Sequence, residues 1–224
     1  MTAKNTKIIF LLAFSIVGFI FLQIPFSKLL GSNVSFTRFD FFGPMAGAFL
    51  GPALGIISVF TVEISNLILN QTPLSTGVVI RLFPMLFSVA YFGLLSGKKS
   101  ENNKWILIVP IIAIALFIAH PIGRTVWYYS LFWTIPIFAY FKKDWLLARS
   151  LGATFTAHAV GGAAWIWAFN LPASVWQGLI PIVIQERLIF ALGIAGSYLI
   201  TRKILRFLAS KSFPLPATSK VLIG

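Results

Sequence analysis

The stretch Arg38 to Gly55, RFDFFGPMAGAFLGPALG, decides the expected fold of this 224-residue chain. Within a helix, residues four apart share a face, so a stripe along which a neighbouring backbone can approach closely is expected at Gly43, Gly47, Gly51 and Gly55. Proline has no backbone N–H and is favoured at the first position of a helix. We therefore expect a short helix to end near Gly51 and another to begin at Pro52.

The same stretch places Asp40 four residues before Pro44 and places a Gly51-Pro52 pair before Gly55. This pattern resembles the substrate-binding S component of energy-coupling factor (ECF) vitamin transporters. In that family an Asp-x-x-x-Pro sequence opens the second helix and a Gly-Pro-x-x-Gly turn leads into the third. The resemblance covers roughly residues 34–70 and implies a membrane protein that captures a vitamin or a related small molecule outside the cell. It also implies two kinds of partner: a transmembrane coupling subunit and ABC-type ATPases.

Composition indicates a membrane environment. Hydrophobic residues make up 58% of the chain and charged residues only 10%, and the mean hydropathy is +0.91. A soluble domain of this size could not bury so much apolar surface in one core. We therefore expect a multi-pass protein of the cell membrane, with the lipid bilayer around it. Cysteine is absent, which excludes disulfides and cysteine metal sites.

Apolar runs divide the chain into eight expected helical segments in a single transmembrane domain over residues 1–224. The segments are 7–27, 39–51, 52–70, 77–97, 105–122, 125–141, 146–170 and 175–201. About 20 helical residues are needed to cross the hydrocarbon layer, so the second segment is short for a crossing. The S components it resembles usually have six helices, and the 105–141 hairpin is the plausible extra pair. The expected fold is all-α, a bundle of six to eight transmembrane segments.

The distribution of lysine and arginine predicts the orientation of these segments. With a cytoplasmic N-terminus and eight crossings, thirteen cations are inside: Lys4, Lys7, Lys98, Lys99, Lys104, Lys142, Lys143, Arg149, Arg202, Lys203, Arg206, Lys211 and Lys220. Three are outside: Lys28, Arg38 and Arg124. This bias predicts that both termini are cytoplasmic and that residues 202–224 form a basic cytoplasmic tail. Anionic lipid then accounts for the net charge of +13, and no nucleic-acid partner is expected.

Ionisable residues inside apolar segments identify a first group of candidate ligand contacts. A charge at the centre of a bilayer costs roughly 3 kcal/mol, so it persists where it is paired or faces water. Glu63 and Asn66 share a helical face near the outer surface, and Arg81 enters the next segment at a similar depth. We expect these three side chains to line a cavity open to the outside. Glu63 and Arg81 either form a structural ion pair or admit the substrate between them.

A second group lies near the middle of the last two segments. His158 and Trp165 share one helical face, and Glu186 and Arg187 follow in the last segment. Adjacent helical residues point about 100° apart, so at least one of the two charged residues needs a partner on another helix or on a ligand. We expect this group to form the cavity floor, with Arg187 or His158 donating to the ligand. His158 could instead be a neutral core residue, and no histidine spacing here suggests a metal site.

Aromatic residues gather at the expected outer ends of the last three segments. Interfacial belts are rich in tryptophan and tyrosine, which is the expected role of Trp127, Tyr128, Tyr129, Trp133, Trp167 and Trp176. Trp165 is the exception, because it shares a face with His158. An aromatic ring beside a histidine in a cavity would suit a flat heterocyclic ligand.

Sequence motifs of enzymes are missing, and no cofactor is expected. The chain has no nucleophile elbow, no His-Glu-x-x-His helix and no phosphate loop. Uphill transport would therefore take its energy from a partner, as in the ECF family, or from an ion gradient. The alternatives are a self-contained carrier or channel, in which Glu63, Glu186 and His158 hold protons or ions, and a non-transporting membrane scaffold. Four arginines in or beside the outer half (Arg38, Arg81, Arg124 and Arg187) against three acids favour an anionic ligand.

Overall fold

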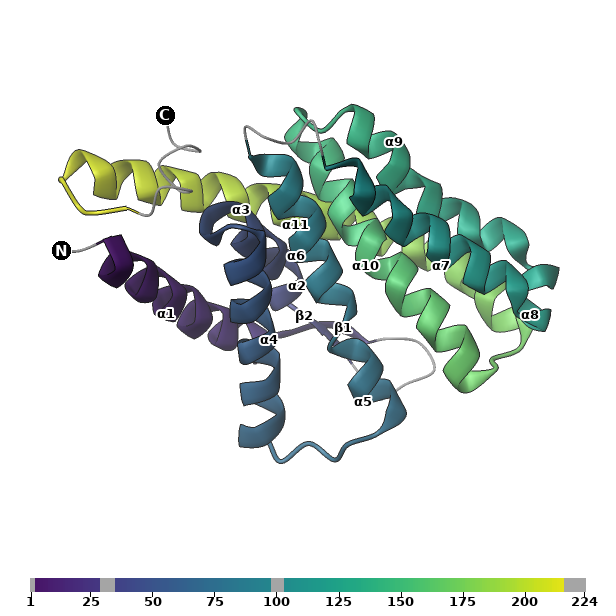
Figure 1. Ribbon diagram of the computed structural model, residues 1–224. Helices are drawn as coiled ribbons and strands as arrows, with labels where there is room; N and C mark the ends of the chain where they lie inside the picture. Colours follow the sequence, from purple (N-terminus) through teal and green to yellow (C-terminus); the bar gives the residue numbers. More distant parts are fainter. Residues whose placement is uncertain (1–2, 29–34, 98–102, 216–224) are drawn as a thin grey trace.

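The structure is a computed structural model that describes residues 3–28, 35–97 and 103–215 (Figure 1). It is a helical protein with one short two-stranded sheet. The elements are α1 (Ala3–Leu22), β1 (Pro25–Lys28), β2 (Ser35–Thr37), α2 (Phe39–Phe42), η1 (Gly43–Met45), α3 (Ala46–Leu50), α4 (Pro52–Leu69), α5 (Thr76–Arg81), α6 (Pro84–Ser96), η3 (Lys104–Leu107), α7 (Ile108–Ala119), α8 (Pro121–Thr125), η4 (Trp127–Thr134), α9 (Ile135–Phe141), α10 (Leu146–Phe169) and α11 (Ala173–Ser210).

Each of the eight predicted segments contains helix in the structure, although the first ends at Leu22, before its predicted end at residue 27, and much of the sixth is the 3₁₀ helix η4. Three helical stretches in the described residues are long and apolar enough to span a membrane: Pro52–Leu69, Thr76–Ser96 and Ala173–Ser210. Shorter apolar helices cover Ile8–Leu22, Phe39–Leu50 and Lys104–Ala119. The helical class is thus confirmed, while the number of crossings and their orientation stay predictions. The 24-residue helix α10 has the length for a crossing, but small and polar residues dilute its hydropathy.

The break between the second and third segments lies at Gly51, as predicted. Helix α3 ends at Leu50 and α4 begins at Pro52. Between them Gly51 has φ 89° and ψ 155°, a backbone conformation that side chains with a Cβ rarely adopt. The junction therefore requires glycine, and the following proline fixes the start of α4.

The four glycines do not form one helical stripe, because Gly43 lies in the 3₁₀ turn η1 and Gly51 lies in the non-helical junction between α3 and α4. Two of them instead make close backbone contacts on either side of α3. A Cβ built on Gly47 would lie 3.0 Å from the Cα of Gly93 in α6, and one built on Gly55 would lie 2.7 Å from the nitrogen of Gly47. The small residues thus let α3 pack directly between α4 and α6, backbone against backbone.

Helix α10 is the central element of the C-terminal half and contacts α6, α7, α9 and α11. Two of its glycines accommodate large rings: Gly152 lies against Tyr91 of α6, and Gly162 lies against Trp133 of η4. The Tyr91 hydroxyl also donates to the Pro136 carbonyl oxygen at 2.6 Å, which ties α6 to α9. The small residues of this segment therefore serve packing within the chain.

Two features differ from the sequence-based expectation. Helix α11 continues to Ser210, nine residues beyond its predicted end at 201, because apolar residues at helical spacing keep one face packed and bury Leu205. The first part of the predicted basic tail is therefore helix, and residues 216–224 of it lie outside the described residues. The second feature is the antiparallel pair β1–β2, in which Ser27 is opposite Phe36. Most of β1 lies within the predicted first helix at 7–27, and β2 lies between that segment and the next.

The first and last helices, α1 and α11, bring the two ends of the described chain close together. The start of α1 and the end of α11 lie near each other on the left of Figure 1, and the α4–α5 connection is at the bottom. An apolar groove runs between α1 and the C-terminal half of α11, lined by residues such as Phe10 and Ile204. The two terminal helices therefore share one end of the molecule.

Candidate functional site

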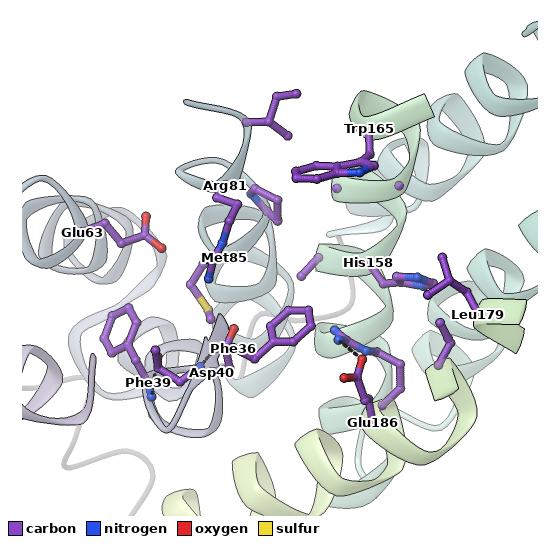
Figure 2. Close-up of a pocket in the computed structure, with 18 of the residues that line it drawn as sticks. Phe36, Phe39, Asp40, Glu63, Arg81, Met85, His158, Trp165, Leu179 and Glu186 are labelled. Carbon is purple, nitrogen blue, oxygen red and sulfur yellow. Dashed lines mark hydrogen bonds and ion pairs between the residues drawn. The ribbon is translucent and has the colours of Figure 1, made fainter. Parts of the chain in front are cut away.

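A cavity of about 160 Å³ lies between the two halves of the chain (Figure 2). Cavities of about 150 Å³ hold a molecule of the size of benzene. The walls come from the end of α1, from β2 and α2, and from α4, α5, α6, η4, α10 and α11. Its charged, polar and tryptophan residues are Thr37, Asp40, Glu63, Arg81, Tyr129, His158, Trp165, Trp176, Glu186 and Arg187.

Six of the seven residues expected to bind substrate line this one cavity: Glu63, Arg81, His158, Trp165, Glu186 and Arg187. Asn66 does not line it. Its Oδ1 accepts hydrogen bonds from Gln23 at 2.6 Å and from Asn70 at 2.8 Å. Three residues along α4 rotate a side chain by about 60° relative to Glu63, which is enough to direct Asn66 to the end of α1 instead.

Glu63 has an unusual environment for a carboxylate. Its Oε2 is buried and has no hydrogen-bond partner in the described residues. Of the two alternatives for Glu63 and Arg81, the structural ion pair is not formed among the described residues, although Arg81 is near enough to Glu63 for electrostatic attraction. Figure 2 shows both side chains reaching toward the same space. Glu63 therefore presents a carboxylate oxygen whose hydrogen-bonding capacity is unused.

Arg187 is held by several partners on the opposite wall. It forms an ion pair with Glu186 at 3.5 Å, although the two residues are adjacent on α11, and its Nη1 donates to the Thr154 hydroxyl at 3.3 Å. The guanidinium lies 4.9 Å from the ring centroid of Phe36 and 4.4 Å from that of Phe190. Cation–π contacts of this kind stabilise a buried cation. Glu186 thus holds Arg187 in place, while Nε of Arg187 is buried without a hydrogen-bond partner among the described residues.

His158 has both ring nitrogens engaged by the protein. Trp133 Nε1 donates to His158 Nδ1 at 3.2 Å, and His158 Nε2 lies 3.0 Å from the Tyr129 hydroxyl. An indole N–H only donates, so Nδ1 carries no proton, and the neutral ring must carry its proton on Nε2. His158 therefore donates to Tyr129 and is neutral, although its side chain also lines the cavity. The Tyr129 hydroxyl keeps its own proton for another acceptor, so it replaces His158 as the donor at the cavity.

Three aromatic residues expected in the interfacial belt are buried in the site or beside it. Tyr129, Trp133 and Trp176 are each 2% exposed or less. By contrast Trp127, Tyr128 and Trp167 are exposed, as a belt requires. Val126, Tyr129 and Trp133 are spaced at offsets of three and seven, which is the spacing of one buried helical face. This spacing could have distinguished the buried Tyr129 and Trp133 from the exposed Trp127 and Tyr128.

Of the residues in the Asp-x-x-x-Pro and Gly-Pro-x-x-Gly motifs, one lines the cavity and the others shape the backbone. Asp40 lines the cavity, and its Oδ2 accepts the Thr37 backbone N–H at 2.8 Å. It lies within electrostatic range of both Arg81 and Arg187. The remaining motif residues, Pro44, Gly51, Pro52 and Gly55, shape the backbone around α3.

The charges in the cavity contradict the expected excess of arginine. Arg38 and Arg124 are exposed and do not line it. The described lining contains three acids (Asp40, Glu63 and Glu186) and two arginines (Arg81 and Arg187). The sequence count therefore gave the wrong sign, since it included arginines that lie outside the cavity.

Comparisons with known proteins give one similar protein of unknown role. The chain is 29% identical over 205 residues to an uncharacterized protein of Methanocaldococcus jannaschii, covering 83% of this chain and 68% of that protein. No protein-family model matches the chain, and no solved structure does.

Proposed function

We propose that the chain is a multi-pass protein of the cell membrane that captures a small molecule in this cavity, as the S component of an ECF-type importer. The observation that supports this most is the convergence of five charged side chains on one cavity inside an apolar helical protein: Asp40, Glu63, Arg81, Glu186 and Arg187. Ionisable residues within membrane helices are costly and usually mark a binding site or a transport pathway.

The state of Glu63 favours a ligand site over a scaffold. In a structural role, buried charges pair with one another, as Glu186 and Arg187 do. Glu63 instead has an unsatisfied buried oxygen facing a space large enough for a small ring. A buried carboxylate oxygen that lacks a hydrogen-bond donor is stabilised when a ligand supplies that donor.

The chain has no nucleotide-binding motif, so the proposal includes a coupling subunit and ABC-type ATPases as partners. The first helix of the S components carries alanines at four-residue spacing for this docking, whereas here the small residues are Ala13, Ser15 and Gly18. Ser15 hydrogen-bonds to Ser58 at 3.0 Å, and Gly18 lies against the Phe39 ring. Two of the three are therefore used within the chain, and the coupling subunit would bind a different face.

Affinity purification of the tagged full chain in mild detergent from its native host tests the proposal. We expect ABC-type ATPases and a membrane subunit to co-purify, and a retained small molecule to be identified by mass spectrometry. The alternative is a self-contained carrier in which the unpaired Glu63 exchanges a proton. Accumulation of the retained molecule by liposomes that contain the chain alone would support that alternative and contradict the ECF role.

The orientation of the chain is tested by cysteine labelling, because the protein has no cysteine of its own. Single substitutions Lys142→Cys and Ser210→Cys are expected to resist an impermeant thiol reagent in intact cells. Leu74→Cys, in the exposed α4–α5 connection, is expected to react, since that connection is predicted to be outside. Labelling of Lys142→Cys or Ser210→Cys in intact cells would overturn the topology. A Leu74→Cys protein that reacts only after cell lysis would overturn it as well.

Loss of the Tyr129 hydroxyl is expected to weaken retention of the bound molecule by about 1 kcal/mol, which is roughly a fivefold change, because one hydrogen bond is lost. Tyr129→Phe should reduce the amount of molecule recovered by mass spectrometry. Tyr128→Phe is the matched control: its hydroxyl accepts from Gln177 at 3.0 Å and does not line the cavity. Equal recovery from both variants would remove Tyr129 from the binding site.

A further inference from the structure

The charges that line the cavity do not balance. The described lining contains three carboxyl groups and two guanidinium groups, one more acid than base. His158 adds nothing, since its hydrogen bonds require the neutral ring. An uncompensated charge away from water is costly, and a protein keeps one where a proton or a bound cation neutralises it.

The excess negative charge lies at Glu63. Arg187 is already engaged by Glu186 and Thr154 on one wall. On the opposite wall, one arginine, Arg81, lies near two carboxyl groups, and it interacts electrostatically with both Asp40 and Glu63. In Figure 2 Glu63 and Glu186 enter the view from opposite sides, with Arg81 and Asp40 between them. The Oε2 of Glu63 is buried and has no hydrogen-bond partner among the described residues, so it is the position at which a cationic donor is missing.

Unused hydrogen-bond donors lie in another part of the lining. The Tyr129 hydroxyl receives a hydrogen bond from His158 and keeps its own proton. Trp176 Nε1 is buried without an acceptor among the described residues, and its ring centroid is 5.0 Å from that of Tyr129. These two neutral donors match an acceptor atom on a ligand.

Aromatic rings form another part of the lining. Phe36, Phe39 and Trp165 contribute rings to the walls. Aromatic faces attract cations and suit flat ligands. Within about 160 Å³ the space admits a single ring with a small substituent.

We propose that the cavity selects a small planar monocation that carries a hydrogen-bond acceptor, with Glu63 as its counter-ion and with Tyr129 and Trp176 as donors to the acceptor. A protonated nitrogen heterocycle and an amidinium compound are both of this class. This inference names the substrate class of the proposed transport function, and it rests on that function only in treating the cavity as a ligand site.

Three probes of one shape and three charges test the sign of the ligand: benzamidinium, benzamide and benzoate. Each is titrated against the purified full chain in detergent by calorimetry. We expect benzamidinium to bind at least tenfold more tightly than benzamide and benzoate to bind weakest. Preference for benzoate, equal binding of benzamide and benzamidinium, or binding of none of the three would overturn the inference.

Two variants locate the groups responsible. Glu63→Gln is expected to lower benzamidinium affinity at least tenfold, whereas Asn66→Ala, one turn away and outside the cavity, should leave it unchanged. Pyridine-3-carboxamidine adds a ring acceptor, so it should bind more tightly than benzamidinium to wild type and lose that gain in Tyr129→Phe. The charge series on the wild-type chain decides the sign even if a variant fails to fold.

The outcome is separable from that of the proposed function. If the chain purifies without ATPases, the ECF role fails while cation selectivity is still measured directly. If benzoate binds best, the cation inference fails while an ECF importer of an anionic molecule still stands.

Discussion

Replacing Gly47 by alanine is expected to destabilise the protein by about 3 kcal/mol, at the upper end of the cost of overpacking. A Cβ at this position would lie 3.0 Å from the Cα of Gly93 and closer still to the Val89 carbonyl oxygen. Both neighbours are backbone atoms of α6, so neither can turn away as a side chain could. Thermal unfolding in detergent, followed by circular dichroism, measures the effect.

Gly196→Ala is the matched control for this prediction. Gly196 lies inside α11, and a Cβ built there meets no atom within 4 Å. The helix propensity of alanine should therefore stabilise the protein by about 1 kcal/mol. If Gly47→Ala and Gly196→Ala had the same unfolding temperature, the close packing of α3 against α6 would be contradicted.

Replacing Arg187 by methionine is expected to cost about 3–5 kcal/mol, the range for removing one partner from a buried charge pair. Arg187 is only 5% exposed, and it is one of two cations beside three carboxylates. Its loss breaks the ion pair between Arg187 and Glu186 and removes one of the two cations near Asp40. The unfolding temperature should fall far below that of the wild type.

Lys203→Met provides the control, since Lys203 is an exposed cation on the same helix. Its removal is expected to change stability by less than about 0.5 kcal/mol, as for most surface positions. An Arg187→Met protein as stable as Lys203→Met would show that the carboxylates in the cavity are neutral, and that Arg187 has no structural role.

Much of the backbone was predictable because glycine and proline act locally. The break at Gly51 and the start of α4 at Pro52 follow from one residue each, so the structure confirms them. The end of α11 and the β1–β2 pair were missed, since both depend on contacts with distant parts of the chain. Burial of Leu205, for example, requires a neighbour that the local sequence does not reveal.

The candidate site was predictable where a charge had to be buried. Glu63 and Arg187 stood out because each is costly inside an apolar segment. Tyr129, Trp133 and Trp176 were assigned to the interface, since tryptophan and tyrosine are equally common in belts and in cores. The expected excess of arginine over acidic residues at the site was also wrong, because sequence position alone did not show that Arg38 and Arg124 lie on the surface.

Native mass spectrometry of the gently purified full chain tests the ligand-binding role most directly. We expect one small molecule per chain in the wild type, retained in Asn66→Ala and lost in Glu63→Gln. We also expect Glu63→Gln to unfold at no lower temperature than the wild type, because the substitution removes a buried carboxyl oxygen that has no hydrogen-bond partner among the described residues. A wild-type protein without any bound molecule, or equal occupancy in Glu63→Gln, would contradict the assignment of this cavity as a capture site.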